Sequence, residues 1–286
     1  MAKVSIIIPS RNEKWLAKTV DDIFAKAIGD IEVIVVADGL SSYEFPKEKP
    51  NLRIISKKKV EGLLPGINDA VDIATGKYIM KCDAHCMFPE GFDEILKKDC
   101  DDDWVVTARR FTLDTNTWKT LPKSAVDYFY LGCPWVMPDY FIMKDRHWLN
   151  KARKKIGVLI DDQMTIHGSI WFMTLEHFKE RVGKFDMRFG NFVGEPHDVA
   201  LKTWLGGGRV IINKKTWYAH ACSARGKRFH LSDVEDVEER KKETYYWVQN
   251  KWDKRIHDFD WLIDKFWPLP NWPNNWREYY EKGLRK

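Results

Sequence analysis

Four apolar runs in the first hundred residues predict buried β-strands. They cover residues 4–8, 31–36, 52–55 and 77–82, and apolar side chains dominate each of them. Parallel strands that helices cover on both faces have this composition. Between these runs, residues 15–27 and 63–74 carry apolar side chains at the spacing of an amphipathic helix. Because strands alternate with helices, we predict an α/β fold, with a mostly parallel central sheet and helices on both faces.

The pattern changes in the second part of the chain. From about residue 110 to 165 it is irregular and rich in aromatic residues and proline, which predicts an insertion over the sheet edge. Regular elements are expected again at residues 166–173 (strand), 175–181 (helix), 195–205 (helix), 210–212 and 217–220 (short strands). Ser232 and Glu235 have the spacing of a capping box for a charged helix. We therefore expect a main domain over residues 1–230 and a helical, Trp-rich C-terminal appendage over residues 231–286.

Polar residues follow three of the predicted strands. Residues 9–13 come after the first strand, Asp38 ends the second, and Asp83 and His85 end the fourth. The carboxyl ends of the strands of an open α/β sheet line the crevice where ligands bind. Two residues apart on extended backbone, Asp83 and His85 point to the same side. A carboxylate and an imidazole together suit a divalent metal such as Mn²⁺, so this pair predicts half of a metal site.

Composition narrows the class of protein. The chain has 286 residues, a net charge of +5 and five cysteines without a Cys-x-x-Cys pair. No run of about eighteen apolar residues is present, so we expect no membrane span. With no signal sequence recognisable, the cysteines indicate reduced thiols and a cytoplasmic protein. Six of the 14 tryptophans lie between Trp247 and Trp276; they either anchor the C-terminal segment or form a stacking surface for sugar or base rings.

Several short motifs occur in the same order as in a known family. Residues 6–13 are similar to its opening strand and donor loop, and residues 83–86 read Asp-Ala-His-Cys, like its Asp-x-His-Cys signature. Residues 194–198 and 204–207 fit its second signature. Over about residues 3–230 the chain resembles the GT-A-fold glycosyltransferases of the large family 2. Within that superfamily it looks most like the catalytic domain of polypeptide N-acetylgalactosaminyltransferases.

The resemblance implies a role for particular residues. Asp83, His85 and His220 would bind Mn²⁺ or Mg²⁺, which holds the diphosphate of a nucleotide-sugar, by analogy a UDP-sugar. Glu195 and Asp198 would align or deprotonate the acceptor. The residues implied in binding the sugar donor are Pro9, Arg11, Glu13, Asp38, Gly62, Asp83, Arg225, Lys227 and Arg228, the last three in a basic loop over the diphosphate. Residues 110–165 would lie on the acceptor side.

Three positions depart from the pattern of the superfamily. Ala37 replaces the first residue of a common Asp-Asp pair, and Val60 stands where an Arg usually precedes the Glu-Gly-Leu of the second helix. Inverting enzymes often carry Glu-Asp where this chain has Glu195 and Pro196. Since proline cannot act as a base, a retaining reaction is the better prediction, although Glu195 or Asp198 could still serve as base.

Other classes of function stay open at this stage. A sugar nucleotidyltransferase would be expected to carry a Gly-rich phosphate loop after the first strand, which residues 9–13 do not provide. A non-catalytic carbohydrate- or nucleic-acid-binding protein would use the aromatic residues and basic clusters without needing Asp83 or His85. For a transferase, the acceptor could be a hydroxylated DNA base, a protein or a glycan. The basic residues 151–155 and 57–59 would suit a polyanion.

Overall fold

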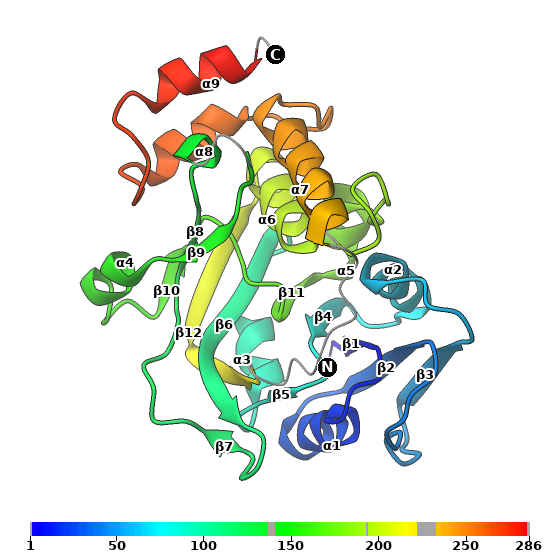
Figure 1. The fold of residues 1–286 in the computed structure, drawn as a ribbon. Helices are drawn as coiled ribbons and strands as arrows, with labels where there is room; N and C mark the ends of the chain where they lie inside the picture. The colour runs from blue at the N-terminus through cyan, green and yellow to red at the C-terminus, as the bar shows by residue number, and fades with distance from the viewer. Residues whose placement is uncertain (1, 137–140, 193, 222–232, 285–286) are drawn as a thin grey trace.

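A computed structural model describes residues 2–136, 141–192, 194–221 and 233–284 (Figure 1). Within these residues, one sheet of ten strands forms the centre of the molecule, in the order β10-β12-β6-β11-β4-β1-β2-β3, with β5 beside β12 and β7 beside β6. The strands are β1 (Val4–Ser10), β2 (Ile31–Asp38), β3 (Leu52–Lys57), β4 (Tyr78–Cys82), β5 (Cys86–Met87), β6 (Trp104–Asp114), β7 (Lys119–Thr120), β10 (Ile160–Asp162), β11 (Ile170–Thr174) and β12 (Arg209–His220).

The sheet is mixed, with parallel pairing in its N-terminal half. β1 pairs in parallel with β2 and β4, and β2 with β3, as the alternation of strands and helices predicts. β6 and β12 are also parallel to each other. β11 runs antiparallel to both β4 and β6, and β10 antiparallel to β12. The four predicted N-terminal strands and their α/β arrangement are therefore confirmed.

Helices cover both faces of this sheet. They are α1 (Leu16–Lys26), α2 (Leu63–Ile73), α3 (Phe92–Lys98), α4 (Leu149–Lys154), α5 (Leu175–His177), the π-helix η2 (Phe178–Val182), α6 (Glu195–Leu205), α7 (Asp233–Val248), α8 (Phe259–Phe266) and α9 (Trp276–Leu284). Successive side chains of a strand point to opposite faces. In β1, Ile6 and Ile8 join the core beneath α1 and α3, whereas Ile7 joins the larger core beneath α2 and α6. Both faces of the strand are thus buried, which explains its continuous apolar run.

Two strand predictions need correction. β6 was not predicted, because charged and polar residues such as Arg109 and Arg110 interrupt its apolar pattern. The two short strands expected near the end of the main domain are one strand, β12, whose register against β6 shifts between Asn213 and Trp217. This long strand carries His220 to the far end of the sheet, beside β5.

The irregular stretch over residues 110–165 includes a small hairpin and an edge strand. β8 (Phe129–Leu131) pairs antiparallel with β9 (Asp145–His147), and β10 returns to the main sheet. The C-terminal helices α7, α8 and α9 gather at the end of the molecule near this hairpin (Figure 1). Trp272 donates a hydrogen bond from Nε1 to the carbonyl oxygen of Leu131, at 2.8 Å. Trp247, Trp252, Trp272 and Trp276 are all buried, so the anchoring interpretation of the C-terminal tryptophans is confirmed for these four.

Two further sequence predictions concern a helix cap and membrane spans. Ser232 of the expected capping box lies outside the described residues, although helix α7 does begin at the next residue. Among the helices that the structure describes, none combines the length and the apolar composition needed to cross a bilayer. The division into a main domain and an appendage stays a prediction.

Candidate metal centre and active site

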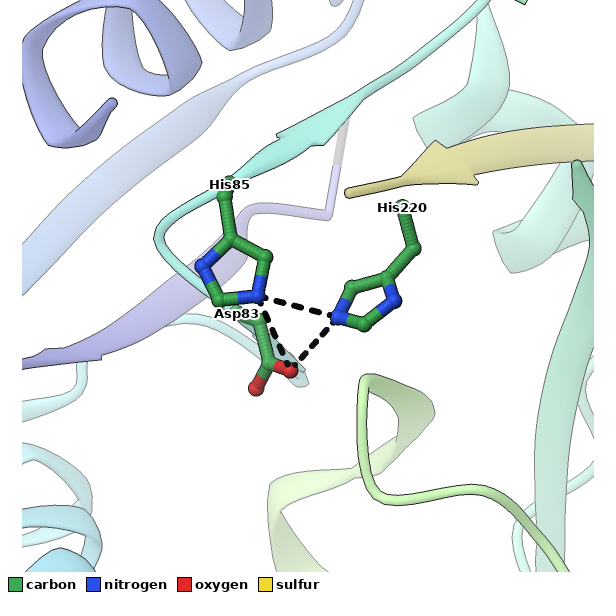
Figure 2. A group of neighbouring side chains, drawn as sticks. All are labelled: Asp83, His85 and His220. Atoms are coloured by element: carbon green, nitrogen blue, oxygen red, sulfur yellow. Dashed lines mark hydrogen bonds and ion pairs between the residues drawn. The ribbon is translucent and has the colours of Figure 1, made fainter. Parts of the chain in front are cut away.

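The three predicted metal ligands meet at the carboxyl end of β4. Asp83 and His85 lie in the turn between β4 and β5, and His220 is the last residue of β12 (Figure 2). Antiparallel pairing of β5 with β12 places His220 opposite Cys86, so two ligands 135 residues apart become neighbours. The backbone between Asp83 and His85 is a turn and not an extended strand, so the predicted geometry was wrong in this detail. The convergence of the two side chains is nevertheless as predicted.

The distances within this group fit a divalent metal. The three ligand atoms lie within 4.8 Å of one another. Nε2 of His220 is 3.0 Å from Nε2 of His85 and 3.0 Å from Oδ2 of Asp83. Adjacent ligands of an octahedral ion with bonds of about 2.1 Å are separated by about 3 Å. Two imidazoles and one carboxylate are a ligand set for Mn²⁺ and similar ions. Among the described residues, no other three such side chains each bring one ligand atom this close to the other two.

Neighbouring residues hold these ligands in place. Oε2 of Glu13 lies 3.2 Å from Nδ1 of His85, the ring nitrogen that faces away from the ligand cluster. A carboxylate in this position fixes the orientation and tautomer of a metal-binding imidazole. The hydroxyl of Thr19, on α1, donates to the carbonyl of Ala84 and accepts from the N–H of Cys86. The turn that carries Asp83 and His85 is thus fixed to α1.

A buried lysine connects the metal ligands to the predicted catalytic carboxylate. Lys81 is 1% exposed, and its Nζ is 2.8 Å from Oδ1 of Asp83 and 3.6 Å from Oε2 of Glu195. It also donates to the carbonyl oxygen of Gly168. Burial acts to raise the pKa of Asp83, but the Lys81 ammonium and the His220 ring hold it well below its usual range. Asp83 is therefore ionised and ready to bind a cation.

The two predicted catalytic carboxylates have different surroundings. Glu195 begins α6, with Pro196 in the first turn, and its carboxylate is buried where it accepts a hydrogen bond from Nε1 of Trp171. Burial raises the pKa of Glu195 despite the opposing charge of Lys81. Asp198 instead pairs with Lys202, one turn further along α6, at 2.8 Å. The structure thus joins Glu195 to the predicted metal ligands through Lys81, whereas Asp198 pairs with Lys202 on its own helix.

Several of the residues predicted to bind the sugar donor lie around the ends of β1 and β2. Pro9 is in β1, and Arg11 is exposed in the loop that follows. Asp38, the last residue of β2, accepts hydrogen bonds from the backbone N–H groups of Glu61 and Gly62, at 2.7 and 3.0 Å. Asp38 therefore orders the loop before α2, and its contact with a nucleoside stays a prediction. Arg225, Lys227 and Arg228 lie outside the described residues.

Sequence reasoning missed several residues at this site. Lys81 was part of the predicted strand over residues 77–82 but had no assigned role; a lysine inside an apolar strand was the available signal. His167 was not singled out, yet its ring lies 5.7 Å from that of His220 between centroids. Burial, together with the nearby Arg110, lowers the pKa of His167 well below its ordinary value, so this ring is neutral. Cys82 and Cys86 are buried, and burial raises the pKa of both thiols, so they are protonated beside the predicted metal ligands.

The fold and the site together define a class of protein: an α/β domain with three side chains that can hold a metal ion at the carboxyl end of β4. The family model described as glycosyl transferase family 2 matches residues 5–169. That match covers more than half of the chain, and the chain belongs to this family. The predicted membership of the family 2 superfamily is thereby confirmed.

Individual relatives agree with this assignment. The chain is 25% identical over 240 residues to polypeptide N-acetylgalactosaminyltransferase 5 of Caenorhabditis elegans, covering 79% of this chain and 38% of that enzyme. It is 25% identical over 232 residues to polypeptide N-acetylgalactosaminyltransferase 10 of Homo sapiens, covering 73% and 36%. The chain therefore spans less than two fifths of the length of these two relatives.

A solved structure shows the same fold. The crystal structure of GalNAc-T7 with UDP, GalNAc and Mn²⁺ superposes with a TM-score of 0.69, at 15% identity, over 93% of this chain and 56% of that one. At this identity the similarity establishes the fold. The predicted GT-A-like architecture with additional C-terminal helices is therefore confirmed.

Proposed function

We propose that this protein is a metal-dependent glycosyltransferase that moves a sugar from a nucleotide-sugar to an acceptor. The observation that carries the proposal is the convergence of Asp83, His85 and His220 at the carboxyl ends of the strands in a family 2 domain. GalNAc-T7, which shares the fold, was crystallised with UDP, GalNAc and Mn²⁺. We therefore infer a UDP-sugar as donor and Mn²⁺ or Mg²⁺ as the ion.

The proposed chemistry assigns a task to each part of the site. A divalent ion held by the three ligands would offset the negative charge that develops on the leaving diphosphate. Glu13 would keep the His85 ring in its ligating orientation, and Lys81 would add a fixed positive charge next to Asp83. Glu195, which is joined to this centre through Lys81, is the better placed of the two carboxylates to align an acceptor hydroxyl.

We infer a retaining reaction. Pro196 follows Glu195 at the position where inverting relatives often carry an acidic residue, and proline offers no base there. The carboxylate of Glu195 already accepts from Trp171 and faces Lys81, so its orientation suits positioning more than proton removal. The anomeric configuration of the product, followed by NMR in the first minutes of the reaction, tests this inference; an inverted product would refute it.

The acceptor predicted from the sequence is a modified nucleic-acid base, a protein or a glycan. The cytoplasmic location stays a prediction of the sequence. Residues 151–155 were proposed to contact a polyanion, but Lys151 packs its ammonium over Tyr128 and Trp148, at 4.9 and 5.1 Å. Lys151 therefore contributes to packing within the domain. Arg153, Lys154 and Lys155 are exposed and available for a charged partner.

Release of UDP from a panel of UDP-sugars, with Mn²⁺, with Mg²⁺ and with EDTA, tests the function. We expect metal-dependent release from at least one donor, accelerated by an acceptor, and its loss in Asp83→Ala. Asp253→Asn, which changes an exposed carboxylate between α7 and α8, is the control and should behave like the wild type. UDP binding without turnover on any donor would favour the non-catalytic alternative, and metal-independent binding unaffected by Asp83→Ala would refute the metal assignment.

A further inference from the structure

Arg110, on β6, is a buried cation with an unusual set of partners. It is 7% exposed, and among the described residues no carboxylate lies within ion-pairing distance of its guanidinium. The adjacent Arg109 provides the contrast, because it makes a bidentate ion pair with Asp127, at 2.8 and 2.9 Å. Arg110 instead packs over the ring of Phe129, at 5.2 Å, and its Nη2 lies 3.0 Å from Nε2 of His147.

His147 does not neutralise this charge. Burial and the neighbouring Arg110 lower the pKa of His147, so the ring is neutral and its Nε2 accepts a hydrogen bond from the guanidinium. One positive charge therefore remains in a largely desolvated place. Burying a charge without an opposite partner is costly, and such a charge is usually paired or binds a ligand.

The position of Arg110 places this charge next to the metal centre. In the parallel pairing of β6 with β12, Arg110 lies opposite Tyr218 and Thr112 lies opposite the metal ligand His220. Opposite residues, and residues two apart along a strand, share a face of the sheet, so Arg110 and His220 are on the same face. The rings of Phe129, His167 and His220 follow one another between them, with centroids 5.6 and 5.7 Å apart.

The same position separates Arg110 from the predicted nucleoside site. β6 is separated from β1 by β11 and β4, whereas the residues predicted to contact the nucleoside lie at β1 and β2. The hairpin β8–β9 supplies Phe129 and His147 next to Arg110. A ligand that reaches Arg110 would therefore approach from the side opposite the nucleoside.

We propose that Arg110, supported by Phe129 and His147, forms a subsite for an oxyanion, a phosphate or a carboxylate, carried by the acceptor. This proposal rests on the proposed glycosyltransferase function. The planar guanidinium lies over the ring of Phe129 and uses one nitrogen for His147, and a guanidinium can bind an oxyanion through two parallel hydrogen bonds of its other N–H groups. The acceptor would thus be anionic close to the hydroxyl that receives the sugar.

Calorimetric titration with methyl phosphate and with acetate, in the presence of saturating UDP and Mg²⁺, tests the subsite. UDP fills the place of the donor diphosphate, so binding that persists comes from a different site. We expect at least one of the two anions to bind the wild type, and Arg110→Met to weaken that binding at least tenfold. Arg110→Lys keeps the charge but loses the planar fork, and should be intermediate. Arg146→Met removes an exposed arginine from the same hairpin and should change the affinity less than twofold.

The outcomes separate this proposal from the one on which it rests. Tighter binding of methyl phosphate identifies a phosphorylated acceptor, and tighter binding of acetate a carboxylated one. If neither anion binds the wild type, or if Arg110→Met binds as the wild type does, the subsite does not exist and Arg110 only packs on Phe129. If UDP abolishes anion binding, Arg110 belongs to the donor site. Failure of UDP itself to bind would refute the proposed function, and the titration without UDP would still test Arg110.

Discussion

Replacing Lys81 with Met should change stability and metal affinity in opposite directions. Methionine keeps the unbranched length of the side chain and removes the ammonium, which is 2.8 Å from Asp83 and 3.6 Å from Glu195. Both carboxylates then lose their buried cation. Removing one partner of a buried ion pair typically costs about 3–5 kcal/mol. We therefore expect Lys81→Met to lower the free energy of unfolding by about that amount when no metal is bound.

The affinity for Mn²⁺ should rise in the same variant. An ion bound at the proposed site would share the carboxylate of Asp83 with Lys81, so in the wild type the two cations would repel each other. At an effective dielectric constant of about 20, a single and a double charge roughly 5 Å apart repel by about 7 kcal/mol. About a fifth of that energy corresponds to a tenfold change in Kd. We expect Mn²⁺ to bind Lys81→Met at least tenfold more tightly, and to recover part of the lost stability.

Urea unfolding in EDTA and in Mn²⁺, together with calorimetric titration of Mn²⁺, measures both effects. Lys202→Met is a matched control, because Lys202 is also buried and pairs with Asp198 at 2.8 Å, away from the metal ligands. It should lower stability without changing the affinity for Mn²⁺. Unchanged or weaker Mn²⁺ binding by Lys81→Met would show that Lys81 does not act on the metal site through its charge.

Three further predictions follow from features of the fold and the site. His220→Ala removes one metal ligand, so UDP binding should lose its dependence on Mn²⁺ in calorimetry; full retention would remove His220 from the ligand set. Burial and Arg181 lower the pKa of His177 to about 4, and the unfolded chain takes up this proton near pH 6.5. Stability should therefore fall by up to about 3 kcal/mol as the pH drops from 6.5 to 4, and His177→Gln should flatten this loss in urea unfolding series; an unchanged slope would contradict the assignment. Trp272→Ala should cost about 3–5 kcal/mol, because it empties a buried site and removes the hydrogen bond to Leu131; a loss below about 1 kcal/mol would mean that the C-terminal segment contributes little.

The sequence predicted the strands whose residues are buried on both faces, because burial leaves an uninterrupted apolar run, as in β1 and β2. It did not predict β6, in which Arg109 and Arg110 have specific partners that no local pattern reveals. Whether such a segment forms a strand depends on contacts across the sheet, since a buried arginine in a strand needs a distant residue that accepts its hydrogen bonds.

The metal ligands could be named from the resemblance, but their surroundings could not. The pair Asp83 and His85 was recognised by its motif, although the reason given, extended backbone, does not hold. The contact between Lys81 and Glu195 joins residues 114 positions apart, on a strand and a helix whose relative placement depends on the whole core. Contacts of this kind need the three-dimensional structure.

The packing of the C-terminal helices against the β8–β9 hairpin has an evolutionary consequence. The metal ligands and the β1–β2 loops are held by the N-terminal strands and by the end of β12, whereas the hairpin is held by Trp272 and its neighbours. Substitutions in the last forty residues can therefore shift the hairpin while the metal ligands and the β1–β2 loops keep their arrangement. For the glycosyltransferase proposed above, such a division would let substitutions in the C-terminal helices change the acceptor while the site of the nucleotide-sugar is retained.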